Sequence, residues 1–206
     1  MIWMGNPCGP AVIESMQAGT IGYIDTPAQG NKRPEGVAWC ADNGCFSDKW
    51  DEAKWWRFLT DNAHRSDTCM FAVAPDIVGD AWRSHMKSQP WLAKIKALGY
   101  PVAYVIQDGA HLHPIPWIEF DVCFIGGSTK YKLGPHVREI VAEAKRRGKW
   151  VHMGRVNSER RWKYADAIGC DSVDGTFLTF GPDVNLPKVL AWTRNNDQLP
   201  LFGAHQ

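Results

Sequence analysis

Short hydrophobic runs that end on a polar residue or a glycine recur along this chain. Five of them are AWCADNG, FAVAPD, AYVIQD, VCFIGG and DSVDGT. Strand-like segments fall near residues 2–4, 20–24, 37–41, 69–74, 102–106, 121–125, 149–153 and 171–173. Eight strands is the number found in a β/α barrel, in which parallel strands alternate with helices.

Helical patterns fill many of the intervals between these strands. The predicted helices span residues 10–18, 48–64, 79–97, 135–147, 158–168 and 186–195. Pro10 and Gly19 fit the usual start and stop signals of a helix, and Ser158 is a good N-cap. Pro and Gly in residues 25–35 and 108–119 predict irregular connections. We expect an α/β fold, a compact (β/α) TIM-type barrel that is abbreviated or distorted, because typical barrels run to about 250 residues.

The composition favours one soluble domain. With 206 residues, 45% of them hydrophobic and 22% charged, the chain can bury a substantial core, so residues 1–206 are expected to form a single domain. No apolar stretch approaches the roughly 20 residues that span a bilayer, and the amino terminus has no signal pattern. We therefore expect no membrane contact and a cytoplasmic location. Six cysteines without a CxxC pair favour buried, reduced thiols.

The residues at the ends of the predicted strands are candidates for a shared site. In a barrel, the loops after the carboxyl ends of the strands gather at one face. Side chains from distant parts of the sequence can meet there. The residues expected to line one pocket are Asp42, Asp76, Gln107, Gly127 and Asp174.

Basic residues are concentrated between Lys130 and Lys163, where eleven Lys and Arg accompany three acidic residues. This segment has a net charge of +8, which leaves −7 for the rest of a chain whose net charge is +1. A basic flank beside an acidic pocket suits a phosphodiester backbone whose base enters the pocket. For residues 145–149 the alternative is a solvated helix exterior. The residues expected to contact phosphates are Lys130, Lys132, Arg155, Arg160 and Arg161.

Taken in order, these segments resemble one known family. ADNG at 41–44, the Asp76 strand end, VIQDG at 105–109, FIGGS at 124–128, VHMGRVNS at 151–158 and GCDSVDGT at 169–176 are similar to segments of the tRNA-guanine transglycosylase superfamily. That superfamily includes queuine and archaeosine tRNA-ribosyltransferases. The chain looks most like the phage and bacterial branch that inserts 7-deazaguanines into DNA. The resemblance covers residues 40–176 and rests on the ordered set.

The resemblance implies covalent catalysis at the anomeric carbon of the sugar. Asp174 matches the nucleophile of the family. Asp42 matches the aspartate of its Asp-Ser-Gly-Gly motif, which serves as general acid/base near the departing base. Here that motif reads Asp-Asn-Gly-Cys, so the Ser and the second Gly are replaced. Both aspartates also suit plain turns, because each lies close to a glycine.

The resemblance also implies a frame that reads guanine, which has donors at N1 and the exocyclic amine and an acceptor at O6. Asp76 would take the donor edge, while the Gln107 amide and the Gly127 N–H would address O6. Such a polar frame rejects bases that lack the matching groups. A helix cap after Pro75 is the alternative for Asp76.

Further walls of the base pocket follow from the same resemblance. Gly126 would let the backbone approach a flat ligand, although a simple bend also explains it. Met153 and Gly154 would form another wall, with ordinary core packing as the alternative for Met153. His152 is either a pocket residue or a buried structural imidazole.

Two features depart from the family. Its tRNA enzymes carry a zinc site of three cysteines and a histidine after the nucleophile strand, whereas this chain has no cysteine beyond Cys170. The chain also continues only a short way past residue 176. Loss of the zinc subdomain weakens the case for tRNA as the acceptor more than it weakens the case for base chemistry. His111 and His113 are spaced for a metal, but the neighbouring prolines suit an exposed loop, so we expect neither a metal nor another cofactor.

The sequence therefore predicts a pentosyltransferase that exchanges guanine in nucleic acid, DNA rather than tRNA, for a free 7-deazaguanine base through a covalent aspartyl intermediate. The target nucleotide would be flipped out of a duplex or presented single-stranded. Two alternatives stay open: a hydrolytic, base-excising DNA glycosylase, and a non-catalytic module that binds a modified base. A homodimer and a larger protein partner are both compatible with the sequence.

Overall fold

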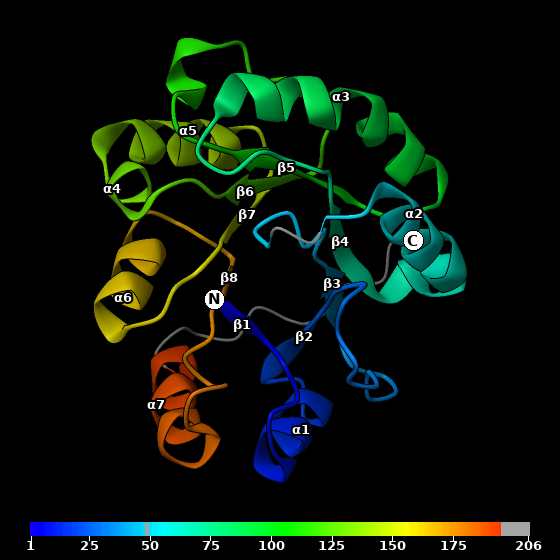
Figure 1. Ribbon diagram of the computed structural model, residues 1–206. Helices are drawn as coiled ribbons and strands as arrows, with labels where there is room; N and C mark the ends of the chain where they lie inside the picture. Colours follow the sequence, from blue (N-terminus) through cyan, green and yellow to red (C-terminus); the bar gives the residue numbers. More distant parts are fainter. Residues whose placement is uncertain (48–49, 195–206) are drawn as a thin grey trace.

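The computed structural model describes residues 1–47 and 50–194. Within these residues, eight strands form one closed barrel in sequence order, and each strand runs parallel to both of its neighbours (Figure 1). Pairing between the first and last strands closes the barrel. The strands are β1 (Ile2–Gly5), β2 (Ile21–Asp25), β3 (Trp39–Ala41), β4 (Cys69–Val73), β5 (Val102–Ile106), β6 (Val122–Ile125), β7 (Trp150–Met153) and β8 (Ser172–Asp174).

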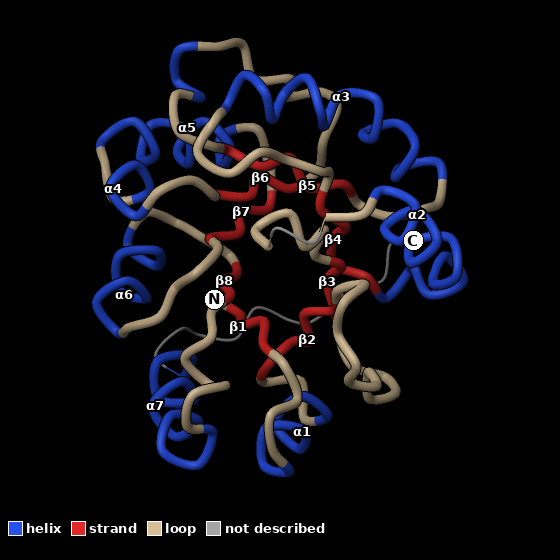
Figure 2. Tube along the Cα trace, viewed as in Figure 1, coloured by secondary structure: helices blue, strands red, loops and turns tan. Residues whose placement is uncertain are grey.

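Helices surround the ring of strands (Figure 2). They are α1 (Pro10–Gln17), α2 (Glu52–Asn62), α3 (Ala81–Ala97), α4 (Thr129–Lys132), α5 (Pro135–Arg146), α6 (Glu159–Ala167) and α7 (Pro182–Arg194). Two short 3-10 helices, η1 (Ala63–Thr68) and η2 (Ala110–Leu112), lie in the connections. Residues 26–38 contain no helix, and residues 107–121 contain only η2.

The predicted TIM-type barrel is confirmed, and its abbreviated form has a clear origin. The β2–β3 and β5–β6 connections lack an α-helix, which agrees with the irregular structure expected from their Pro and Gly content. The short helix α4 was not predicted. Residues 48–49 and 195, at the edges of two predicted helices, lie outside the described residues, and the single domain over 1–206 stays a prediction.

Local signals fix the ends of several helices. Pro10 begins α1, and Gly19 follows its end with φ 72°, a conformation that glycine adopts without strain. Ser158 precedes α6, and its Oγ accepts a hydrogen bond from the Arg161 backbone N–H at 3.4 Å. These helix ends are as the sequence predicts.

Alternation along each strand decides which side chains lie inside the barrel. A continuous interior cluster includes Cys40, Phe71 and Val105, whereas their neighbours in sequence pack between strands and helices. Every second residue of a strand faces the interior, and the last inward-facing positions at the carboxyl ends of the strands line the opening of the barrel. The residues at these positions are Asp42, Gln107, Gly126, Gly154 and Asp174.

The structure shows which of the cysteine thiols are buried. The cysteines of the described residues are free, with four buried and two, Cys8 and Cys45, partly exposed. The expected burial therefore holds for most of the thiols.

No helix in the described part of the chain is both long enough and apolar enough to cross a membrane.

Candidate active site

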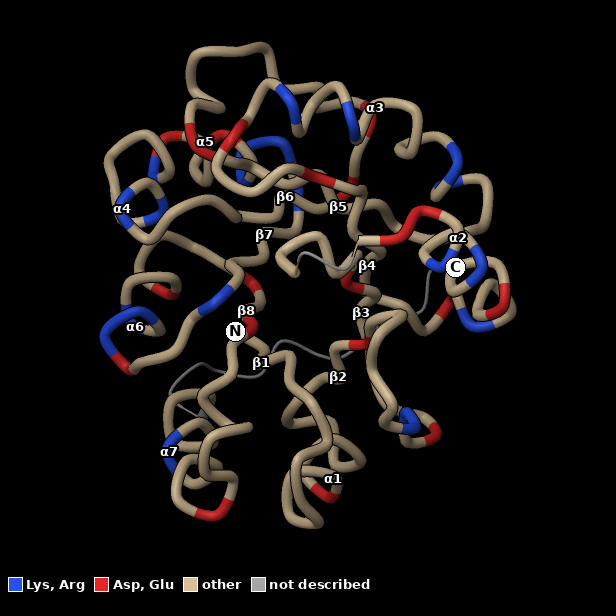
Figure 3. Tube along the Cα trace, in the orientation of Figure 1, with Lys and Arg blue, Asp and Glu red and all other residues tan. Residues whose placement is uncertain are grey.

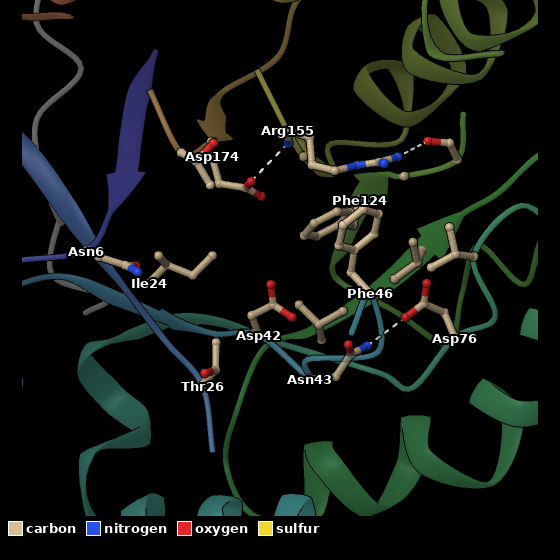
Figure 4. Close-up of a pocket in the computed structure, with 18 of the residues that line it drawn as sticks. Asn6, Ile24, Thr26, Asp42, Asn43, Phe46, Asp76, Phe124, Arg155 and Asp174 are labelled. Atoms are coloured by element: carbon tan, nitrogen blue, oxygen red, sulfur yellow. Dashed lines mark hydrogen bonds between the residues drawn. The ribbon is translucent and has the colours of Figure 1, made fainter. Parts of the chain in front are cut away.

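A cavity of about 590 Å³ opens at the carboxyl ends of the strands. Its position is the usual one for the active site of a barrel, and its size falls within the roughly 300–1,000 Å³ typical of small-molecule sites. Figure 4 shows the carboxylates of Asp42 and Asp174 pointing into it from different strand ends. The cavity brings together the five residues expected to share a pocket: Asp42, Asp76, Gln107, Gly127 and Asp174.

Asp174, at the end of β8, has a hydrogen-bond contact to each carboxylate oxygen. Oδ1 accepts from the Arg155 backbone N–H at 2.9 Å, and Oδ2 lies 2.9 Å from Nε2 of His152. Burial alone would raise the pKa of Asp174, but the contact with His152, the Arg155 amide and the charge of Lys132 together lower it below the ordinary value. The carboxylate is therefore held ionised, as a nucleophile requires.

Arg155 forms part of the cavity wall. Its backbone has φ 59°, the one positive value found for a non-glycine residue in the described part of the chain. This conformation costs energy for a residue with a side chain, and such strain is concentrated at functional sites. The guanidinium donates to the Gly127 carbonyl and lies 4.5 Å from the ring centre of Phe46. These contacts engage part of the guanidinium, and the predicted contact of Arg155 with a phosphate stays a prediction.

Asp42 follows β3 and lies across the cavity from Asp174 (Figure 4). Its Oδ1 accepts from the Gly44 backbone N–H at 2.8 Å, the turn contact that the sequence allowed. Burial raises the pKa of Asp42 to about 7, since the Gly44 bond offsets it only in part and the charges of Asp174 and Asp76 add to the rise. The two carboxyl groups thus have pKa values moved in opposite directions, as in sites that pair an acid/base with a nucleophile.

Asp76 forms a buried polar cluster with two side-chain amides. Its Oδ1 accepts from Asn43 Nδ2 at 2.8 Å, and its Oδ2 accepts from Gln107 Nε2 at 2.6 Å. Burial raises the pKa of Asp76, and these two bonds offset part of that rise. The Gln107 Oε1 accepts from the Gly79 N–H at 2.9 Å, so the orientation of the amide is fixed. The second N–H of Gln107 has no acceptor among the described residues, so it is available to a ligand.

Gly126 and Gly127 bring the backbone to the cavity surface. A Cβ at Gly126 would lie 2.7 Å from Cγ1 of Val105, so no larger residue fits without displacement. Asp108 anchors the following residue, because its carboxylate accepts from both the backbone N–H and the hydroxyl of Ser128 at 2.6 Å. Within the described residues the Gly127 N–H has no acceptor. It is therefore available to a ligand oxygen.

Met153 does not line the cavity, which corrects its predicted place in the wall. Its side chain is buried in the layer between strands and helices. The preceding residue, His152, faces the interior, and Gly154 lines the cavity. The resemblance placed Met153 and Gly154 on one wall, but adjacent residues of a strand face opposite sides.

The predicted phosphate-contacting residues differ in how exposed they are. Lys132 is 3% exposed, and its Nζ donates to the Gly154 carbonyl at 2.5 Å. Burial lowers the pKa of Lys132 to about 8. Lys132 therefore holds the loop after β7, which corrects its predicted role. Lys130 and Arg160 are exposed, and Arg161 is half-buried with Nη1 3.4 Å from the Arg155 carbonyl.

Residues 145–149 lie at the opposite end of the barrel from the cavity. They comprise the last two residues of α5 and the three residues that lead to the amino end of β7. Lys145 pairs with Asp171 at 2.7 Å, and Arg146 pairs with Glu143 at 2.7 Å. Lys145 and Arg146 therefore lie on the exterior of a helix, where they pair with acidic residues nearby. Figure 3 shows basic positions on the surrounding helices.

The metal-ligand pattern in the sequence does not form a cluster. In residues 1–47 and 50–194, no group of three or more His, Cys, Asp or Glu is arranged to hold a metal. His111 stacks on His136 with ring centres 3.7 Å apart, whereas the His113 ring lies 5.4 Å from that of Trp82. The two histidines therefore have separate aromatic contacts.

Sequence reasoning missed several residues of the cavity. Asn43 directly follows Asp42, and a buried amide at a strand end was the available signal. Phe46 lines the mouth although it is 66% exposed, and nothing in the strand pattern points to it. Other polar residues that line the cavity are Asn6, Thr26, Gln29, Asn157, Thr176 and Thr179.

Gly175→Ala should destabilise the protein. An added Cβ would lie 2.5 Å from the carbonyl oxygen of Val156, a backbone atom that cannot rotate away. We expect a loss of about 1–3 kcal/mol in the free energy of unfolding, the usual cost of overpacking. Thermal and denaturant unfolding measure it. Gly30→Ala is the control, since nothing lies within 4 Å of its added Cβ, and equal effects of both changes would contradict the prediction.

Comparisons with known proteins identify a shared fold. No protein-family model and no curated protein matches the sequence. Among solved structures, RipC from Yersinia pestis has 8% identity and a TM-score of 0.54, over 94% of this chain and 93% of RipC. The FimX EAL domain of Xanthomonas citri, in complex with c-diGMP, has 16% identity and a TM-score of 0.42, over 82% of this chain and 64% of that domain. The likeness to RipC concerns the fold alone.

Proposed function

We propose that this protein exchanges guanine in nucleic acid for a free 7-deazaguanine base, with Asp174 as nucleophile and Asp42 as general acid/base. One observation carries the proposal. Two carboxyl groups face the same cavity, one with a lowered pKa and one with a pKa raised to about 7. Displacement at a glycosidic carbon uses such a pair, an ionised nucleophile and a protonated acid.

The proposed reaction has two balanced steps. In the first, a carboxylate oxygen of Asp174 bonds to C1′ of the sugar, the C1′–N9 bond breaks, and Asp42 gives its proton to a ring nitrogen of the departing guanine. In the second, Asp42 takes the N9 proton of the incoming base, N9 bonds to C1′, and the ester to Asp174 breaks. Both carboxyl groups return to their starting states, and the steps use only protein side chains.

Base recognition follows from the polar groups left open in the cavity. Asp76 has acceptor capacity beyond its two amide bonds and can receive the donor edge of guanine. The remaining N–H of Gln107 and the N–H of Gly127 are donors suited to O6. Phe46 and Phe124 add aromatic surface to the same cavity. This set favours a flat base that has two adjacent donors and one acceptor.

The acceptor in this proposal is DNA rather than tRNA. A base within a duplex cannot reach a cavity inside a barrel mouth, so the nucleotide must be flipped out or single-stranded. The exposed side chains of Lys130 and Arg160 would contact its phosphates.

The two lysines of α4 differ in exposure, so only the exposed one, Lys130, is expected to contact a phosphate. Lys130→Met should reduce the slope of log K for DNA binding against log salt by about 1, because an exposed contact to one phosphate is lost. Lys132→Met should leave that slope unchanged, because the ammonium is buried against the Gly154 carbonyl. Fluorescence anisotropy at several salt concentrations measures both slopes. Equal slopes for the two variants would contradict this assignment.

Nucleoside mass spectrometry tests the proposed reaction. Duplex DNA, single-stranded DNA and tRNA are each incubated with the protein and free 7-deazaguanine bases. Incorporation of the deazaguanine supports base exchange and identifies the polymer. Abasic sites without incorporation would indicate hydrolysis instead. Bound base or nucleic acid with no change in any polymer would indicate a non-catalytic module.

A further inference from the structure

A buried histidine lies behind the proposed nucleophile. His152, on β7, has 0% exposure, with Nε2 2.9 Å from Oδ2 of Asp174 and Nδ1 2.8 Å from Oγ of Ser172. Ser172 is also fully buried. The reaction proposed above uses Asp174 and leaves His152 without a role.

The donors and acceptors of the hydrogen-bonded series from Trp150 through Ser172 and His152 to Asp174 decide where each proton lies. The indole Nε1–H of Trp150 can only donate, and it lies 2.8 Å from Oγ of Ser172. Ser172 therefore accepts from Trp150 and can donate its own proton to Nδ1 of His152. The imidazole proton then resides on Nε2 and points at the Asp174 carboxylate. With this arrangement, every polar side-chain group of the hydrogen-bonded series has a partner.

The other protonation states leave a buried group without a partner. A proton on Nδ1 alone would turn the Nε2 lone pair toward the Asp174 carboxylate, which is repulsive. A proton on both nitrogens would make Ser172 accept twice and leave its hydroxyl proton without an acceptor. An unsatisfied buried polar group costs about 1–3 kcal/mol. These contacts therefore favour the Nε2–H tautomer over the Nδ1–H tautomer.

Aromatic rings hold the imidazole in place. The ring centre of Phe124 on β6 lies 4.5 Å from that of His152, and Phe71 on β4 lies at 5.0 Å. Asp174 is the one charged side chain that contacts the imidazole in the described residues. The charge of Lys132 acts on Asp174, and the charge of Asp174 in turn raises the pKa values of the nearby Cys40 and Asp42.

We infer that the Trp150–Ser172–His152 chain is a positioning device, which fixes the proton on Nε2 of His152 and so aims and keeps ionised the carboxylate of Asp174. The inference rests on the proposed function for its catalytic consequence. His152 is a positioning residue, because it reaches the sugar only through Asp174 and no proton needs to leave it during the reaction.

Ser172→Ala is the most selective test, since it keeps His152 and Asp174 and removes the hydroxyl that sets the tautomer. We expect kcat/KM for exchange at pH 6 to fall on the order of 10²-fold, the cost of a misaligned reacting group. The loss of activity at low pH, which reports protonation of Asp174 and is called the acid limb of the pH profile, should move to higher pH. KM for the free base should be unchanged. His152→Leu should act in the same way, and His152→Gln, which can still donate to Asp174, should restore part of the activity.

Ser88→Ala is the matched control, because Ser88 is also fully buried and its hydroxyl donates to the Pro75 carbonyl. It should leave the acid limb in place. A merely structural role for Ser172 would lower activity at every pH and leave the limb unmoved. An unmoved limb in both Ser172→Ala and His152→Leu would overturn the inference.

Nitrogen NMR of the histidine side chains separates this inference from the proposed function. In the protein without ligand, His152 should show a protonated Nε2 and an unprotonated Nδ1, with His152→Gln assigning the signal. Carbon NMR should show that Asp174 titrates at lower pH in the wild-type protein than in His152→Leu. Those two results would support the positioning device even if no base exchange occurred. Protonated Nδ1, or the same Asp174 titration in both proteins, would overturn it.

Discussion

Asp174→Asn is expected to abolish base exchange while the protein still folds and still binds the base. The amide is close in size to the carboxylate, and its oxygen can still accept the hydrogen bond from Nε2 of His152. It cannot form the covalent bond to C1′. Exchange should fall on the order of 10⁴-fold or more, the scale of losing a nucleophile. Affinity for the free base should change little, because Asp76, Gln107 and Gly127 remain.

Three measurements check this result. Nucleoside mass spectrometry quantifies incorporation, a denaturing gel detects the covalent protein–nucleic acid adduct, and calorimetry measures binding of the base. Mass spectrometry of the purified variant verifies that the new Asn-Gly sequence has not deamidated to Asp. Asp183→Asn is the control, since Asp183 is an exposed carboxylate in the first turn of α7. Full activity in Asp174→Asn would exclude Asp174 as the nucleophile.

Asp42→Asn is expected to lower exchange by about 10²–10⁴-fold, the usual contribution of general acid/base catalysis. The loss should depend on the leaving group. An activated nucleoside whose base departs without a proton should be cleaved at close to the wild-type rate, because Asp174 is intact. An equal loss for both substrates would indicate that Asp42 positions the substrate rather than transfers a proton.

The pH dependence provides a second test of Asp42. Because its pKa is raised to about 7, the protonated acid is lost as pH rises through that value, so cleavage should decline on the alkaline side. The folded protein also binds more protons than the unfolded chain between 3.8 and about 7, so this group's contribution to stability decreases as pH rises through that window. Asp42→Asn should remove the alkaline limb and flatten the thermal stability over the same range. An alkaline limb that persists would exclude Asp42 as its source.

The sequence was informative about this fold because strands and their ends are local signals. The hydrophobic runs located the strands, and the polar residue after a run located Asp42 and Gln107 near the cavity, since both are set by short-range alternation. Met153 was misplaced because a motif match gives the order of residues but does not say which side of the strand each one faces. His152 was left undecided for the same reason.

Charge was harder to interpret than strand pattern. Lys132 and Lys130 are two residues apart on the short helix α4, yet one ammonium is buried and the other is exposed. The burial of Lys132 depends on a carbonyl at Gly154, which is distant in sequence. A basic residue in a surface-like segment is thus a phosphate contact or an internal anchor, and only the tertiary structure separates the two.

Closure of the barrel between β1 and β8 has a consequence for folding. Met4 lies opposite Asp174 in this pairing, so the wall beside the residue proposed to attack the sugar is complete only when the two most distant strands in the sequence meet. Such long-range pairings form slowly, because the closure entropy of a long loop opposes them. An intermediate with most strands in place would therefore still lack a complete site, and the return of activity on refolding would report the final closure of the barrel.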